Sequence, residues 1–161
     1  MLSFFKKKEE TVKELKACLS GTVIPIEEVE DEMFASKTLG DGVGIRPGSN
    51  IVTAPCDGVI SVVMQSSKHA VGMTLNNGAE ILIHVGLDTV NMEGEGFTLF
   101  VKEGDKVKAG EKLLQFEPEL IISKGYKTTT VIVVTNTDEF PDAKYISGME
   151  ARQNETEIMV F

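Results

Sequence analysis

Residues 79–98 read Ala-Glu-Ile-Leu-Ile-His-Val-Gly-Leu-Asp-Thr-Val-Asn-Met-Glu-Gly-Glu-Gly-Phe-Thr. The β-branched run at 81–85 predicts a strand, and the side chains of a strand alternate between its two faces. The face that we expect in the core carries Ile81, Ile83 and Val85, and the outward face carries Leu82, His84 and Gly86. Histidine occurs only twice in the 161 residues. The outward position of His84 therefore marks a candidate site.

The second histidine, His69, lies ahead of His84 in the chain and directly follows Ser66, Ser67 and Lys68. Between the two histidines, residues 76–78 read Asn-Asn-Gly, and both residue types tolerate the positive φ that tight β-turns need. A hairpin folded at this turn pairs the strand that starts near His69 with the strand that ends near His84. The sequence therefore predicts that the two histidines are neighbours in one small polar site.

Several motifs occur in the order typical of one family. They are Ala-Pro-Cys-Asp-Gly at 54–58, Lys-His-Ala-Val-Gly at 68–72, Ile-His-Val-Gly-Leu-Asp-Thr-Val at 83–90, Gly-Glu-Gly-Phe at 94–97, Glu-Gly-Asp-Lys-Val-Lys-Ala-Gly at 103–110 and Val-Thr-Asn at 134–136. In these motifs the chain resembles the glucose-type enzyme IIA (EIIA type-1) proteins of the bacterial sugar phosphotransferase system. The resemblance covers residues 17–160.

The resemblance implies a phosphoryl carrier. Nε2 of His84 would accept the phosphoryl group, as a tele-phosphohistidine, while the carbonyl of Gly86 anchors Nδ1–H. His69 would stabilise the phosphoryl oxygens, and Ser67 would orient His69. The phosphate would come from the phosphocarrier HPr and leave to a cysteine of enzyme IIB, ending on the sugar. The resemblance implies no required cofactor.

The resemblance also implies a partner-binding rim around the histidines. We assign Asp88 to this rim because its charge would repel a bare phosphate but can meet basic groups of a partner. The expected partner-binding residues are Asp31, Met33, Phe34, Leu82, Gly86, Asp88 and Val90.

Two alternatives remain open. His69 and His84 could hold zinc shared with a partner, but a catalytic zinc site needs three protein ligands, and the His-x-His motif of related peptidases is lost because position 82 is leucine. The chain could also be a regulatory module whose phosphorylation state changes which targets it binds.

Composition narrows the range of functions and partners that the chain can have. The net charge of −9 disfavours nucleic acid as a partner and suits basic proteins. No apolar run reaches the ~18 residues of a membrane span, so we expect a cytoplasmic protein. Cys18 and Cys56 lack metal-ligand spacing, and we expect two buried thiols rather than a disulfide.

Turn residues about ten positions apart predict an all-β fold, an antiparallel β-sandwich or barrel of many short strands with little helix. The expected strands cover 23–26, 51–53, 59–64, 69–75, 81–85, 97–101, 112–116 and 130–134. Segments 52–60 and 101–107 look alike, as in duplicated hybrid barrel-sandwich domains that carry biotin or lipoate. Those carriers need a lysine at a hairpin tip, where residues 76–78 supply none. We interpret 39–44 as a turn and 119–123 as at most a turn.

Residues 1–16 differ from the rest, and we interpret them as a flexible or amphipathic N-terminal tail ahead of an enzyme IIA domain at 17–161. The tail starts with apolar residues 1–5 and continues with Lys6, Lys7 and Lys8, a combination that suits peripheral contact with anionic lipid at the inner face of the membrane. Residues 9–16 could form a short helix.

Overall fold

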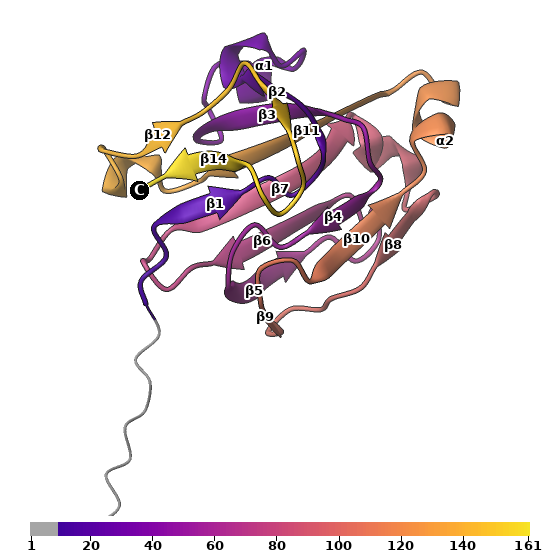
Figure 1. The fold of residues 1–161 in the computed structure, drawn as a ribbon. Coiled ribbons are helices and arrows are strands. Elements are labelled where there is room, and N and C mark those ends of the chain that lie inside the picture. Colours follow the sequence, from indigo (N-terminus) through magenta and orange to yellow (C-terminus); the bar gives the residue numbers. More distant parts are fainter. Residues whose placement is uncertain (1–9) are drawn as a thin grey trace, which may run out of the picture.

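An eight-stranded antiparallel sheet dominates the structure, a computed structural model that describes residues 10–161 (Figure 1). Its strand order is β13-β2-β3-β11-β7-β6-β5-β9, and two three-stranded sheets, β4-β10-β8 and β1-β14-β12, pack against it. The all-β antiparallel prediction is confirmed, but the large sheet is not closed into a barrel because its end strands, β13 and β9, do not pair.

The elements have the following bounds. The strands are β1 (Glu14–Lys16), β2 (Gly21–Pro25), β3 (Asp41–Pro47), β4 (Ile51–Thr53), β5 (Gly58–Val63), β6 (Ala70–Thr74), β7 (Glu80–Leu87), β8 (Phe97–Leu99), β9 (Lys106–Val107), β10 (Lys112–Phe116), β11 (Lys127–Val134), β12 (Lys144–Tyr145), β13 (Glu150–Ala151) and β14 (Glu157–Val160). The helices are η1 (Ile26–Glu28), α1 (Glu32–Ala35), η2 (Thr89–Met92), α2 (Pro118–Ser123) and η3 (Thr137–Glu139).

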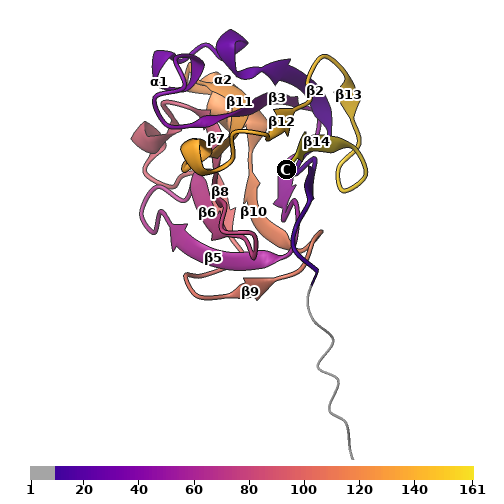
Figure 2. The same ribbon diagram turned by 90° about the vertical axis from the view of Figure 1, so that its left-hand side faces the viewer.

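The two faces of the large sheet have separate apolar clusters. The inner face carries Ile81, Ile83 and Val85 of β7, which are at most 2% exposed and belong to the main core with residues of the two small sheets. The outer face carries a smaller cluster, in which Val131 and Val133 of β11 pack under the segment that contains η1 and α1. Figure 2 shows α1 above β7 on this outer side. The alternation predicted for residues 81–85 is thus confirmed.

Two local predictions are wrong. Residues 39–44 were expected as a turn, but β3 begins at Asp41, because the glycines let neighbouring strands approach closely: a Cβ on Gly42 would collide with the Ile132 carbonyl of β11. Residues 119–123 belong to a short helix, α2, which starts at Pro118, a residue suited to the first helical position.

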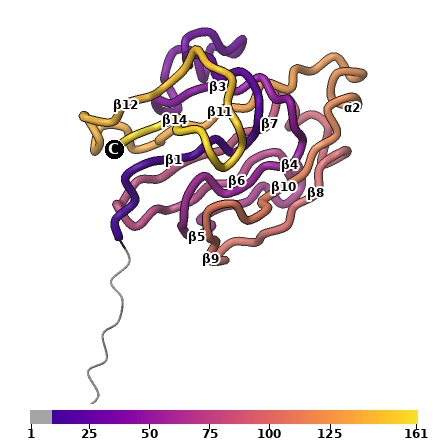
Figure 3. The backbone as a smooth tube through the Cα atoms, viewed as in Figure 1, coloured from indigo at the N-terminus to yellow at the C-terminus, as the bar shows by residue number. Residues whose placement is uncertain are grey.

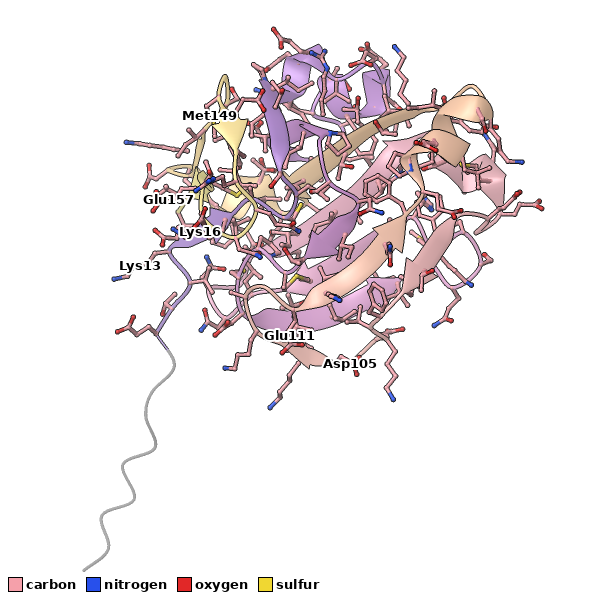
Figure 4. The ribbon with its side chains drawn as sticks, turned by 45° about the vertical axis from the view of Figure 1, so that its right-hand side comes forward. Lys13, Lys16, Asp105, Glu111, Met149 and Glu157 are labelled. Carbon is pink, nitrogen blue, oxygen red and sulfur yellow. The ribbon has the colours of Figure 1, made fainter. Side chains whose placement is uncertain are left out.

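The helix considered for residues 9–16 is also wrong where the structure describes them. Residues 14–16 form β1, which pairs with β14, so that the first and last strands lie side by side (Figure 3). Leu15 is fully buried, and the Lys16 ammonium lies 3.5 Å from the Glu157 carboxylate (Figure 4). Residues 1–9 lie outside the described residues, so the predicted membrane-contacting tail stays a prediction.

Two further observations bear on the predicted chemistry. Cys18 and Cys56 are buried free thiols, as predicted, and burial raises the pKa of each to about 12. Among residues 10–161, no helix combines the length and the apolar character needed to cross a bilayer.

The Gln153 amide ties three separate parts of the chain together. Its Nε2 lies 2.8 Å from the Cys18 carbonyl, 2.6 Å from the Ile51 carbonyl and 2.9 Å from the Thr53 hydroxyl. Thr53 in turn donates its hydroxyl to Asn154. The amide thus joins the segment that follows β13 to Cys18 and to β4 by hydrogen bonds.

We expect Gln153→Ala to lower the free energy of unfolding by about 1–3 kcal/mol, because it removes the partly buried hydrogen bonds that the amide makes to Cys18, Ile51 and Thr53. Urea denaturation measures the change. Gln65→Ala, at an exposed position, is the control and should change stability by less than about 0.5 kcal/mol. Equal effects of the two substitutions would contradict the proposed role of Gln153.

Candidate functional site

The β6–β7 hairpin brings the two histidines together. Its register pairs Ala70 with His84, and Gly78 adopts the expected positive φ, 90°, at the tip. The ring centroids of His69 and His84 lie 4.6 Å apart, and the rings are nearly perpendicular, at 88°. The prediction that the histidines are neighbours is therefore confirmed.

His69 is held firmly in place. It is 4% exposed, its Nδ1 lies 2.8 Å from the Ser67 hydroxyl, and its carbonyl accepts a hydrogen bond from the Val85 amide. The preceding residue, Lys68, has a positive φ of 57°, an uncommon conformation for a residue with a side chain. Ser67, predicted to orient His69, is thus in direct contact with it.

His84 lies half-buried on the outer face of β7, against the ring of Phe34, with a centroid separation of 4.9 Å. Its Nδ1 is buried and has no hydrogen-bond partner among the described residues. The expected hydrogen bond from Nδ1–H to the Gly86 carbonyl is thus not formed with normal geometry. The Gly86 backbone still lies near enough to raise the His84 pKa, so it is a candidate anchor for Nδ1.

Burial keeps both imidazoles neutral near pH 7. It lowers the pKa of His69 to about 4, with a further contribution from His84. Burial also lowers the pKa of His84, although the Gly86 backbone and the charges of Asp31 and Asp88 act in the opposite direction. A neutral imidazole keeps one nitrogen lone pair, which is the requirement for a nucleophile.

Gly86 occupies a tight corner directly after the strand residues His84 and Val85. Its φ is +77°, and a Cβ there would collide with the Thr89 methyl and lie 2.9 Å from the Lys127 carbonyl. Glycine is needed for the backbone conformation and for this close approach. Thr89 is fully buried and was not among the predicted site residues. Its place in the 83–90 motif was the only signal in the sequence that could have identified it.

The predicted rim residues differ in exposure. Met33 is 51% and Val90 53% exposed, whereas Phe34 is 3% exposed. Leu82 and Asp31 are half-buried, Gly86 is buried and Asp88 is exposed; Asp31 also caps α1 by accepting a hydrogen bond from the Met33 amide.

The same face carries an apolar residue that the sequence analysis missed. Val62 of β5 pairs with Gly72 of β6, and Gly72 pairs with Leu82, so these directly opposed residues share the His84 face. Val62 is 41% exposed. The predicted strand 59–64 already placed Val62 in the sheet. Which face its side chain occupies depends on the strand register, which the sequence does not reveal. The apolar rim thus extends across three strands.

The described residues contain no group of three or more His, Cys, Asp or Glu side chains that could hold a metal ion. Zinc bound by His69 and His84 would therefore need ligands from another molecule. A hollow of about 850 Å³ lies elsewhere, between residues 47–50 and α2, and is lined by neither histidine. The candidate site is therefore separate from this hollow, and it consists of a half-buried His84 packed against a His69 that is 4% exposed.

Comparison with known proteins agrees with this geometry. Residues 13–140 match the family model described as phosphoenolpyruvate-dependent sugar phosphotransferase system, EIIA 1. The chain belongs to this family. EIIA type-1 proteins are phosphotransferase components, so this chain is a carrier component of a sugar phosphotransferase system.

Similar EIIA proteins occur free and fused. A glucose-specific EIIA component of Bacillus cereus is 50% identical over 154 residues, or 96% of this chain and 91% of the relative. A glucose-specific EIIBCA component of Corynebacterium glutamicum is 44% identical over 87% of this chain, which corresponds to 20% of that protein. The solved glucose permease IIA from Mycoplasma capricolum has 34% identity and a TM-score of 0.82, with 99% of both chains covered.

The low pKa of His69 makes stability depend on pH. The folded protein binds a proton at His69 less readily than the unfolded chain does. The contribution of neutral His69 to the free energy of unfolding is therefore complete above pH 6.5 and is lost as the pH falls towards 4. We expect a loss on the order of 3 kcal/mol from this group.

Urea denaturation between pH 7 and pH 4 measures this loss. We expect His69→Gln to show a shallower fall in unfolding free energy than wild type, since glutamine does not titrate. The comparison removes the shared contribution of the carboxylates. Parallel curves for the two proteins would contradict the assignment.

Proposed function

We propose that this EIIA protein accepts a phosphoryl group from phospho-HPr on Nε2 of His84 and passes it to a cysteine of enzyme IIB for sugar uptake. The observation that carries the proposal is the perpendicular contact of two neutral imidazoles, one of them on a strand whose opposite face is fully buried. A rigid support and a free lone pair are what a nucleophile requires. We infer that the exchange takes place in the cytoplasm.

Each transfer exchanges one bond to phosphorus for another. In the first step the Nε2 lone pair of His84 forms a bond to phosphorus as the bond to HPr breaks. In the second step a cysteine thiolate of IIB attacks phosphorus, and the bond to Nε2 breaks, which returns the lone pair to Nε2. The proton on Nδ1 stays on the ring throughout. Because the transition state is loose, catalysis depends mainly on position and on stabilisation of charge.

His69 supplies a donor for the phosphoryl oxygens in this proposal. With its Nδ1 directed at the Ser67 hydroxyl, Nε2 is the nitrogen left to donate, and the Ser67 contact keeps the ring from rotating. The T-shaped arrangement supports this division, since the edge of one ring faces the other. Ser67 therefore acts through His69 rather than on the phosphoryl group.

Partners would dock on the apolar rim around His84. Met33 and Val90 are exposed apolar anchors, while Asp31, Asp88 and the net charge of −9 favour basic partners. The less exposed residues beneath these anchors, Leu82, Phe34 and Gly86, would support the docking surface. HPr and IIB would use this surface in turn, because both must reach the same nitrogen, and regulatory targets could bind the same surface.

His84→Gln should abolish phosphorylation, since the amide has no comparable nucleophile. His69→Gln should still accept phosphate, because glutamine keeps an N–H donor, but onward transfer to IIB should fall by about 100-fold. The measurement is intact mass after incubation with phosphoenolpyruvate, its phosphotransferase enzyme and HPr, with phosphohistidine mapping at alkaline pH. Normal phosphorylation of His84→Gln, or a stable phosphate on His69 in wild type, would overturn the assignment.

Met33→Glu and Val90→Glu should each raise the KM for phospho-HPr about tenfold, because each removes an apolar anchor and adds a charge. The kcat should change little, since neither residue touches the reacting atoms. Phe100→Glu is the matched control: Phe100 is 45% exposed and follows β8 in a small sheet. An equal rise in KM for the control would refute the docking surface.

A further inference from the structure

The corner that follows His84 is held by one buried threonine. Thr89, the first residue of η2, is 0% exposed, and its hydroxyl donates to the Val85 carbonyl at 2.6 Å. Val85 lies between His84 and Gly86 in the chain. The hydroxyl therefore holds the peptide group between Val85 and Gly86.

The Thr89 methyl restrains the same corner from a second direction. It lies where a Cβ on Gly86 would be, so it packs directly over the Gly86 α-carbon. The Lys127 carbonyl crowds the same position, at 2.9 Å, and β11 shifts register between Lys127 and Thr130. Atoms of η2 and β11 thus pack against this side of the Gly86 α-carbon, which restricts movement of the Gly86 backbone.

His84 needs such a fixed carbonyl. Its Nδ1 is buried without a hydrogen-bond partner, and the Gly86 backbone is the group whose hydrogen-bonding effect raises the His84 pKa most. If the Gly86 peptide rotated away, the ring could place its proton on either nitrogen. Only the tautomer with the proton on Nδ1 leaves Nε2 free to react.

We infer that Thr89 is a positioning residue, which holds the Gly86 backbone against His84 and thereby fixes the tautomer that keeps Nε2 free. This inference rests on the proposed function of His84 as the phosphoryl acceptor. The Thr89 hydroxyl donates to Val85 rather than to His84, so Thr89 acts through the Val85–Gly86 peptide group and through its packing on Gly86.

Thr89→Val tests the hydroxyl, because valine keeps the shape and loses the hydrogen bond. In the full-length chain with ¹⁵N-labelled imidazoles, NMR at pH 7 should find wild-type His84 protonated at Nδ1, whereas the variant should show a mixture of tautomers and a lower His84 pKa. The kcat for phosphorylation by phospho-HPr should fall about tenfold with KM unchanged.

Two further variants separate position from stability. Thr53→Val removes another buried threonine hydroxyl, away from the histidines, and should leave tautomer and kcat unchanged. Thr89→Ser keeps the hydroxyl and should restore the wild-type tautomer and rate. This serine variant also keeps the inference testable if Thr89→Val does not fold, since a folded serine variant with mixed tautomers would overturn the role of the hydroxyl.

A wild-type tautomer and rate in Thr89→Val would overturn the inference, as would an equal loss of rate in Thr53→Val. Failure of the proposed function is distinguishable, because wild-type protein would then take up no phosphate on His84 in the intact-mass experiment. The tautomer measurement uses no partner protein, so it tests the role of Thr89 in either case.

Discussion

The register of the β6–β7 hairpin is the constraint on which the site depends. The turn at Asn76, Asn77 and Gly78 fixes it, and a shift of one residue would turn His84 into the core and Ile83 outwards. The inner-face residues Ile81, Ile83 and Val85 resist such a shift, because their burial would be lost together. The contact between the two imidazoles is therefore a consequence of core packing on the far side of the same strand.

Desolvation sets the chemistry of these histidines. His84 is half-buried and His69 is 4% exposed, and this burial lowers the pKa of each ring. A solvated histidine would carry a proton in a larger fraction of molecules and lose its lone pair. The apolar surroundings, which include Phe34 and the paired strands β6 and β7, thus keep the nucleophile in its reactive neutral form. The negative charges of Asp31 and Asp88 partly offset the lowering of the His84 pKa.

Local patterns were enough to predict the strands around the site and the meeting of the histidines, since a hairpin is a short-range structure with a clear turn signal. They were not enough for β1, which forms only because β14, at the other end of the chain, supplies a partner. Glycines misled the interpretation of 39–44, because a glycine-rich segment can be either a turn or a strand packed closely on its neighbour. Thr89 was missed since its importance lies in three-dimensional contacts with Gly86 and Val85, which no spacing reveals.

The tip of the β6–β7 hairpin also binds the N-terminal segment of the described chain. Asn76 binds Glu10 and Val12 through its side-chain amide, and Asn77 donates to the Val12 carbonyl, so the described chain begins at the turn. His84 lies six residues beyond Gly78, about 20 Å along the strand. A tether attached at the N-terminus therefore pulls on the end of the domain remote from the histidines. It can raise the local concentration of a partner without shielding the reactive nitrogen, an arrangement compatible with both free and fused forms of the domain.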